Sequence, residues 1–219
     1  MLYLGFNTLP RSVFWSAYLN GRSDNADVMC LMTQQFIQHC QHGEFEKLRA
    51  LLETQTIDVN SQDEGGCTGL HLAIGDRYRN VVNLLIEHNP SFSLRDNTGY
   101  CSLHWAVLAG EQYYLDLVWE HFQEIESPDN SNYRPIHLAI IHKQLASLHW
   151  LMERGANLNP QDKDGYTPLH LAVSANLLAF ALALLSNGAS EALLNNDKET
   201  PLEMAIKIEN YEMAELIGT

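Results

Sequence analysis

Apolar residues recur along most of this chain at helical spacing, and the pattern repeats at a constant interval. The segments TGLHLA, CSLHWA, RPIHLA, TPLHLA and TPLEMA begin at Thr68, Cys101, Arg134, Thr167 and Thr200, each 33 residues after the one before. A second apolar stretch follows each of the first four segments and ends near a Gly or Asn. Each unit is therefore predicted to be helix, turn, helix and loop, and the fixed period indicates a stacked array.

The opening segments contain residues that start a helix and allow close packing. Thr167 followed by Pro168 suits a helix start, because the Thr hydroxyl can cap free N–H groups and Pro has no N–H to leave unpaired. Small residues recur at one place in every unit, which predicts close approach of neighbouring helices. They are Ala73, Ala106, Ala139, Ala172 and Ala205, and the apolar positions expected to be buried between units include Leu70, Val81, Leu84 and Leu85.

Both ends of the array differ from its middle. Gln38–Asp63 has the second helix and the loop of a unit without its opening segment, which predicts an N-terminal capping repeat. At the other end the pattern stops inside the second helix. A terminal unit needs a polar outer face, because no neighbour covers it. That face is expected from Glu203, Lys207, Glu209, Glu212 and Glu215.

The period, the T-P-L-H-x-A segment and the G-A-x-x-N exit resemble the ankyrin repeat, with the closest matches at Tyr166–Ala172 and Arg154–Asn159. The resemblance covers about residues 36–219 and implies an all-α ankyrin-repeat solenoid of about six repeats, the first and last atypical, with β-hairpin-like loops. The chain departs from the family at several turns. Gly69 and Ser102 replace Pro, Cys101 and Arg134 replace Thr, and Arg77, Lys143 and Asn176 stand where the family prefers Gly between its helices.

Residues 1–35 precede the repeats and are expected to form an extension or capping segment. Ser12–Asn20 could form a short helix that presents Phe14, Trp15 and Tyr18, either to cover the first repeat or as an independent docking motif. Arg22–Asp27 is expected to be a polar linker.

Charge and cysteine content limit the classes of partner and the cellular compartment that we expect. With 13 Lys and Arg against 27 Asp and Glu, the net charge of -14 opposes binding to nucleic acid and anionic lipid and favours a partner with a basic surface. No apolar run approaches the roughly 20 residues that span a bilayer, so no membrane association is expected. The four cysteines lack a CxxC or other metal-ligand spacing, which favours reduced thiols in the cytoplasm, with the nucleus as the alternative.

Four histidines, His71, His104, His137 and His170, recur at the repeat interval. The family resemblance implies that each ties one loop to the next by hydrogen bonds. Zinc ligands must converge on one point, whereas histidines in successive repeats form a row. His137 and His142 are five residues apart, whereas a helical zinc site uses histidines four residues apart. No catalytic motif is recognised, so we expect no catalytic, cofactor-binding or metal-binding residue and no enzyme activity; an enzyme or metal protein is the remaining alternative.

Variable positions indicate where a partner could bind. Just before the opening segments lie three consecutive tyrosines, Tyr100, Tyr133 and Tyr166, which either form a recognition stripe or pack on neighbouring loops. Between Asp96 and Tyr133 the sequence has no Lys or Arg, and its acidic and aromatic residues suit a basic peptide or form a solvated face. The acidic residues are Asp96, Glu111, Asp116, Glu120, Glu124, Glu126 and Asp129.

The resemblance implies an adaptor that binds a protein partner through the concave face of loop tips and first helices. An inhibitory regulator of a transcription factor, faintly suggested by LAIIH at Leu138–His142, and a pathogen effector that targets a host protein are the alternatives. The identity of the partner and the oligomeric state stay open. The expected partner-binding residues are Tyr100, Trp105, Leu108, Glu111, Tyr113, Tyr133, Ile141, His142 and Tyr166.

Overall fold

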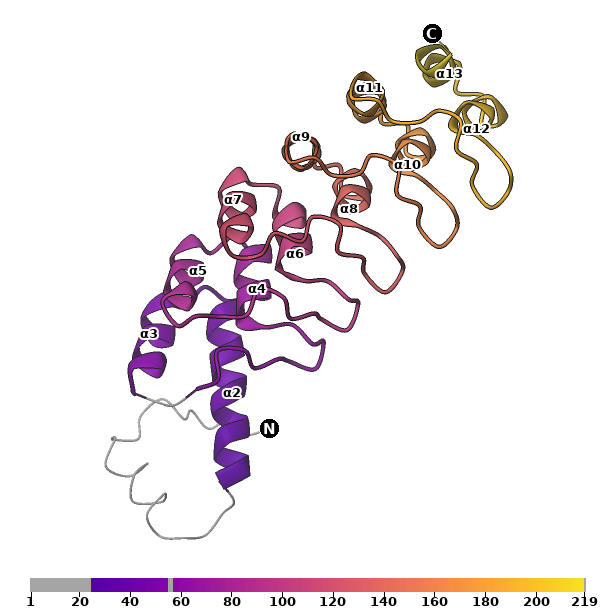
Figure 1. Cartoon of the computed structure of the whole chain (residues 1–219). Helices are drawn as coiled ribbons and strands as arrows, with labels where there is room; N and C mark the ends of the chain where they lie inside the picture. Colours follow the sequence, from indigo (N-terminus) through magenta and orange to yellow (C-terminus); the bar gives the residue numbers. More distant parts are fainter. Residues whose placement is uncertain (1–24, 55–56, 219) are drawn as a thin grey trace, which may run out of the picture.

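The computed structural model describes residues 25–54 and 57–218, which form pairs of helices stacked side by side (Figure 1). One row contains the first helix of each repeat, the other row contains the second helix, and the long loops all project to the same side. We call these the first-helix row (α2, α4, α6, α8, α10, α12) and the second-helix row (α3, α5, α7, α9, α11, α13). The bounds are α2 (Asn25–Gln41), α3 (Phe45–Thr54), α4 (Gly69–Gly75), α5 (Arg79–Ile86), α6 (Ser102–Ala109), α7 (Gln112–His121), α8 (Pro135–Ile141), α9 (Leu145–Glu153), α10 (Pro168–Ser174), α11 (Leu178–Ser186), α12 (Pro201–Lys207) and α13 (Tyr211–Ile217).

The solenoid prediction is confirmed, and its core is a ladder of small and aliphatic residues. Each helix packs on its partner in the same repeat, and each helix of the first-helix row packs on the equivalent helix of the next repeat. The five alanines of the opening segments are all 0% exposed, and Leu70, Val81, Leu84 and Leu85 are buried as expected. Between Ser61 and Gly218 no strand is present, and one isolated bridge pairs Gln62 with Thr68, so the loops are hairpin-like only in their turns.

Helix starts use the caps that the sequence predicts, with an additional role for histidine. The Thr68 hydroxyl accepts a hydrogen bond from the backbone N–H of His71 at 3.2 Å. In return the Nδ1 of His71 accepts the backbone N–H of Thr68 at 3.3 Å. Where Arg134 replaces Thr, the Nδ1 of His137 still accepts the Arg134 N–H at 3.0 Å. The departures at this position therefore leave the helix start intact.

The turns between paired helices keep one geometry despite their different residues. Gly110 adopts a left-handed conformation with φ 72°, and Arg77 (63°), Lys143 (56°) and Asn176 (52°) adopt the same one. A residue with a Cβ atom in this conformation costs roughly 1 kcal/mol or more. At Arg77 the side chain partly offsets this cost, because its Nε donates to the carbonyl of Ala109 in the next repeat at 2.9 Å.

The N-terminal repeat has a longer first helix than the other repeats. Helix α2 packs against α3 and α4, and its Phe36 and Cys40 are 0% exposed, so α2 supplies the helix that the capping repeat lacked in sequence. It begins at Asn25, so the linker predicted for Arg22–Asp27 is wrong at its last three residues. The predicted helix at Ser12–Asn20 lies outside the described residues.

The last repeat presents the polar residues that the sequence assigned to it. Glu203, Lys207, Glu209, Glu212 and Glu215 are all exposed. The same repeat also exposes three large apolar side chains, Ile206, Ile208 and Tyr211. Its outer face is therefore mixed in character.

Candidate binding surface

The loop tips are shaped by an aspartate that recurs as Asp96, Asp129 and Asp162. The Oδ1 of Asp96 accepts the backbone N–H groups of Thr98 and Tyr100, each at 2.9 Å. Asp129 and Asp162 hold the N–H groups of Tyr133 and Tyr166 in the same way. A side chain that bonds its own backbone in this manner fixes a turn, so each tyrosine is held at a defined place beside its helix start.

Neighbouring loop tips are joined by asparagine. The backbone N–H of Asn97 donates to the carbonyl of Gly65 at 2.9 Å, and its Nδ2 donates to the carbonyl of Glu64 at 2.8 Å. Asn130 and Asn196 make the equivalent pair of bonds to the loops before them. The signal in the sequence was an Asp or Asn followed by Asn at 96–97, 129–130 and 195–196, with Lys163 in place of the Asn in the repeat between the last two.

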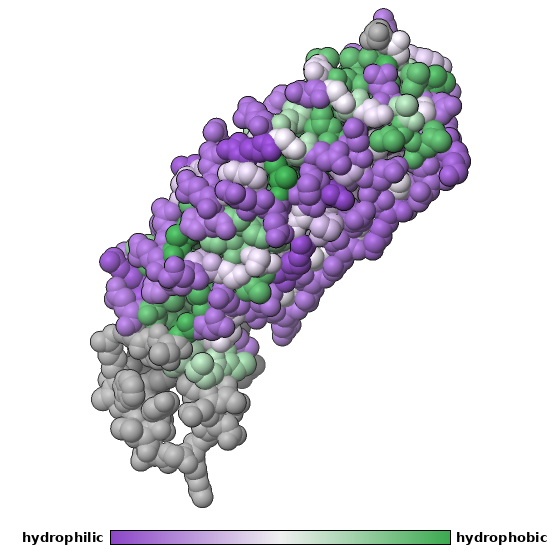
Figure 2. Space-filling view, in the orientation of Figure 1, coloured by the Kyte–Doolittle hydropathy of each residue, from purple (hydrophilic) through white to green (hydrophobic). Residues whose placement is uncertain are grey.

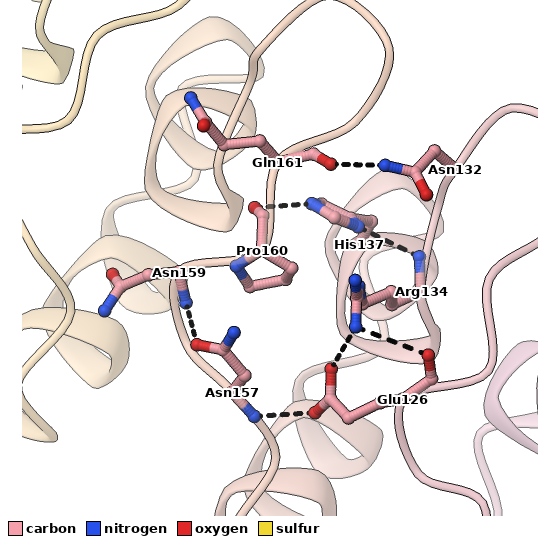
Figure 3. A network of polar contacts seen from close by, with 8 residues as sticks. All are labelled: Glu126, Asn132, Arg134, His137, Asn157, Asn159, Pro160 and Gln161. Atoms are coloured by element: carbon pink, nitrogen blue, oxygen red, sulfur yellow. Dashed lines mark hydrogen bonds and ion pairs between the residues drawn. The ribbon is translucent and has the colours of Figure 1, made fainter.

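The joint between the third and fourth loops is different. Lys163 replaces the Asn, and its Nζ donates to the carbonyl of Asn130. Figure 3 shows the other contacts across this joint. The Nδ2 of Asn132 donates to the carbonyl of Gln161 at 2.7 Å, and the Nε2 of His137 contacts the carbonyl of Pro160 at 3.1 Å.

Glu126 is the centre of the polar network at this joint (Figure 3). Its Oε2 pairs with Nη1 of Arg134 at 3.0 Å, and its Oε1 accepts the backbone N–H of Asn157 at 2.7 Å. Asn159, the equivalent residue one repeat later, accepts the N–H of Ser190 in the same way. Glu126 therefore performs the regular linking role and adds an ion pair.

Replacing Glu126 with Ala is expected to lower the free energy of unfolding by about 1 kcal/mol, because the ion pair is partly exposed and the lost hydrogen bond is single. The measurement is urea unfolding followed by circular dichroism. Glu120→Ala is the matched control, since Glu120 is an exposed acidic residue of the same repeat and a surface change of this kind stays within about 0.5 kcal/mol. Equal unfolding curves for the two variants would show that the contacts of Glu126 with Arg134 and Asn157 do not stabilise the fold.

The four recurring histidines are buried parts of the fold. Because a backbone N–H can only donate, Nδ1 of His137 must accept, and the proton resides on Nε2, which donates to Pro160. His170 donates to the carbonyl of Glu199 at 3.1 Å in the same way. Burial lowers the pKa of His71, His104 and His137 to about 4, so these rings are neutral at pH 7.

In the described residues the potential metal ligands are dispersed and the cysteines form no disulfide. Among residues 25–54 and 57–218 no group of three or more His, Cys, Asp or Glu side chains is placed to hold a metal ion. All four cysteines are free. Burial, with Asp63 and Asp96 nearby, raises the pKa of Cys67 to about 12, so this thiol stays protonated at neutral pH.

The tyrosine stripe is half-buried and packs on the histidine ladder. The ring of Tyr100 stacks on that of His104 with centroids 5.3 Å apart. Tyr133 and Tyr166 contact the histidines of their own repeats edge-on, each with centroids 5.7 Å apart. Each ring thus stiffens its own loop and leaves part of its surface accessible.

The predicted residues on the first-helix row differ in exposure. Trp105 is half-buried, since its Nε1 donates to Asp96 Oδ2 at 3.1 Å and its ring stacks on His71. Leu108 is half-buried, Ile141 is 41% exposed, and His142 is exposed. Leu108 and Ile141 are equivalent residues of adjacent helices, so an apolar residue occupies the same position in α6 and α8.

Neighbouring repeats supply cations to the acidic stretch. Glu111 pairs with Arg79 at 2.7 Å and with Arg77 at 3.6 Å. Asp116 pairs with Arg154 at 2.6 Å. The arginines lie 32 to 38 residues from their acidic partners in the sequence. The segment from Asp96 to Tyr133 therefore contains no cation of its own, although neighbouring repeats supply cations to it.

Two of the predicted residues lie away from the first-helix row. Tyr113 is in α7 of the second-helix row, where its hydroxyl donates to Asn83 Oδ1 and its ring lies under Arg79. Glu111 is the N-cap of the same helix. Trp105 and Leu108 lie in α6, Ile141 lies in α8 with His142 at its C-cap, and Tyr100, Tyr133 and Tyr166 directly precede the N-caps of α6, α8 and α10, whereas Glu111 and Tyr113 belong to α7 and its N-cap.

Comparison with known proteins agrees with this architecture. In the described residues no helix has the length and apolar content needed to cross a membrane. A search of curated proteins gives no match. A family described as ankyrin repeats (3 copies) matches residues 36–129 and 136–218. The matched ranges cover most of the chain, and it belongs to the ankyrin-repeat family.

Proposed function

We propose that this chain is an adaptor that binds a protein partner on the first-helix row of its middle repeats, beside the tyrosines of the loop tips. Ankyrin repeats are protein–protein interaction modules. The observation that carries the proposal is the apolar pair Leu108 and Ile141 on the accessible side of α6 and α8. The equivalent positions in other repeats hold Gly75, Ser174 and Lys207, so the apolar surface is confined to the middle of the array.

Aromatic and aliphatic groups at this surface suit the centre of a protein interface. Trp105 and the three tyrosines are held by hydrogen bonds and ring contacts, so little side-chain freedom is lost when a partner binds. Rigid aromatic residues around an apolar centre are common among residues that dominate binding energy. The net charge of -14 favours a partner with a basic surface.

The double variant Leu108→Ser and Ile141→Ser is expected to weaken binding of the partner at least about tenfold, because two apolar side chains lose their buried contacts. The partner is first recovered by affinity purification with the unaltered chain, and its affinity is then measured by calorimetry at several salt concentrations. Leu182→Ser is the matched control, since Leu182 is an exposed apolar residue of the second-helix row.

Unchanged affinity in the double variant would place the partner elsewhere on the molecule. Affinity that falls as salt rises is the expected result for a basic partner, because salt screens attraction between exposed charges. If the affinity does not depend on salt, the partner does not bind through a basic surface, and only the apolar contact with Leu108 and Ile141 stays proposed.

We further propose that the chain is not an enzyme and works in the cytoplasm. The neutral, hydrogen-bonded histidines and the raised pKa of Cys67 support the first statement, since general bases and nucleophiles need accessible and reactive groups. The four free cysteines support the second, because reduced thiols are usual in that compartment.

A further inference from the structure

The second and third repeats leave a cavity between the segments that follow their second helices. In the view of Figure 2 most of the surface is hydrophilic, and apolar patches interrupt it in a few places. The cavity has a volume of about 360 Å³ and is partly open to solvent. Pockets for small ligands span about 300–1,000 Å³, so this cavity has room for one large side chain. Its apolar lining is formed by Ile86, Pro90, Phe92 and Phe122.

The cavity lies where the third repeat departs from the others. Phe122, directly after α7, has an extended backbone with φ -148° and ψ 100°. The residues at this position in the second, fourth and fifth repeats all have a left-handed backbone. They are Asn89 (φ 53°), Gly155 (77°) and Gly188 (89°). The chain therefore leaves α7 in a different direction, and a phenyl ring lines the cavity at a position where the fourth and fifth repeats have no side chain.

His121 provides the cavity with an unused hydrogen-bond acceptor. Its ring stacks on that of Phe92 with centroids 4.6 Å apart. Its Nδ1 lies 2.9 Å from the carbonyl oxygen of Leu117, and because a carbonyl can only accept, the proton resides on Nδ1. Nε2 of the neutral ring is then an acceptor, and no donor within residues 25–54 and 57–218 contacts it.

The lining matches an indole ring. An acceptor beside apolar walls suits an occupant with a large apolar body and a single N–H or O–H donor. Trp has both, since its indole Nε1–H can only donate. Phe has no donor, and Tyr offers a smaller ring. Lys and Arg would bring a charge to a lining that contains no carboxylate.

The described part of this chain holds its own indole rings by similar contacts. Trp105 stacks on His71 with centroids 6.0 Å apart, and its Nε1 donates to Asp96 Oδ2 at 3.1 Å. Trp119 contacts Trp150 edge-on, and the Nε1 of Trp150 donates to Asp116 at 2.8 Å. These three indoles are part of the fold, so none of them is available to fill the cavity.

We propose that this cavity binds an exposed tryptophan side chain of a partner protein. The indole packs on Phe92 and Phe122, and its Nε1–H donates to Nε2 of His121. Trp in a desolvated pocket is among the residues that dominate binding energy at protein interfaces. The site goes beyond the proposed function, because it lies beside the second-helix row and shares no residue with the surface around Leu108 and Ile141.

The test titrates isotope-labelled protein with three synthetic peptides with blocked ends: Ser-Ala-Trp-Ala-Ser, Ser-Ala-Phe-Ala-Ser and Ser-Ala-Ala-Ala-Ser. The Trp peptide is expected to shift the NMR amide signals of residues 86–93 and 119–123. The Phe peptide should bind about fivefold more weakly, because it cannot donate a hydrogen bond to His121. The Ala peptide should not bind, since it has no ring to bury.

Two variants separate the hydrogen bond from the apolar contact. His121→Phe keeps a ring over Phe92 and removes the acceptor, so the Trp and Phe peptides should bind it equally. His149→Phe is the matched control at an exposed histidine of α9, and the preference for Trp should persist in it. Phe122→Gly gives the third repeat the residue that the fourth and fifth repeats have at this position, and it should weaken binding of the Trp peptide about tenfold. If Phe122→Gly does not fold by circular dichroism, Phe122→Ala replaces it.

Several results would overturn the proposal. They are no binding of the Trp peptide, equal binding of the Trp and Phe peptides to the unaltered chain, a preference for Trp that persists in His121→Phe, and shifted signals only on the first-helix row. Tighter binding of the peptide after Trp15→Phe would assign the cavity to the chain's own Trp15 and exclude the partner. The Leu108→Ser and Ile141→Ser variant should bind the Trp peptide unchanged, so this site and the proposed function are tested independently.

Discussion

Lowering the pH from 7 to 5 is expected to reduce the free energy of unfolding by roughly 5 kcal/mol. His71, His104 and His137 have a pKa of about 4 in the folded chain, against 6.5 for an ordinary histidine. Between these two values the unfolded chain binds protons that the folded chain does not. Stability is therefore fully present above about pH 6.5 and is lost as the pH falls toward 4, by roughly 2 kcal/mol per histidine between pH 7 and pH 5.

The physical cause is the geometry of the ladder. Burial disfavours the charged imidazolium, and Nδ1 of each ring already accepts a backbone N–H, so a proton on Nδ1 would face another proton. The carboxylates with a lowered pKa, such as Glu199 and Glu203, titrate below the ordinary value of 4.5. A comparison made between pH 7 and pH 5 therefore reports mainly on histidine.

Urea unfolding curves at a series of pH values measure this effect. His137→Gln should reduce the pH dependence by about a third, one of three similar contributions, because a Gln amide can accept the Arg134 N–H without titrating. His142→Gln is the matched control at an exposed histidine five residues away. Parallel pH profiles for His137→Gln and the unaltered chain would contradict the assignment.

Gly99→Ala is expected to lower the free energy of unfolding by about 3 kcal/mol. Gly99 has φ 91°, and a Cβ atom there would lie 2.7 Å from the backbone nitrogen of Asn130. That nitrogen donates to Thr98 and joins the second and third loops. The change therefore combines left-handed strain of about 1 kcal/mol with an overlap against backbone that costs about 1–3 kcal/mol.

Gly155→Ala separates the two contributions. Gly155 also has positive φ, 77°, but no atom lies within 4 Å of its added Cβ. Only the strain of about 1 kcal/mol is expected there. Thermal and urea unfolding of both variants provide the measurement, and equal losses would show that the loop contact at Gly99 contributes nothing.

The fold could be predicted from the sequence because the repeat interval is constant and each signal recurs in register. Thr68 and His71 have local roles that depend on neighbours within a few residues, and such roles can be read from one unit. Five units with the same spacing then fix which helices stack. Ile141 and His142, two of the expected partner-binding residues, are exposed in the structure.

The electrostatics of the surface could not be predicted in the same way. Whether Asp116 is free depends on Arg154, which is 38 residues later and reaches back from the next repeat. Asp96 counted as a surface charge in the sequence, yet its side chain shapes its own loop and contacts Trp105. The balance between recognition and packing in the tyrosine stripe likewise depends on contacts with His104 and its equivalents.

The unusual joint at Lys163 has a consequence for how the array responds to salt. Asparagine amides join Asn97, Asn130 and Asn196 to the loops before them, whereas the charged side chains of Lys163 and Glu126 contact across the joint between the third and fourth loops, and Arg134 pairs with Glu126 inside the third loop. Dissolved ions weaken partly exposed charged contacts more than amide hydrogen bonds. Rising ionic strength should therefore loosen the joint between the third and fourth loops, and a partner that spans α6 and α8 would lie next to it.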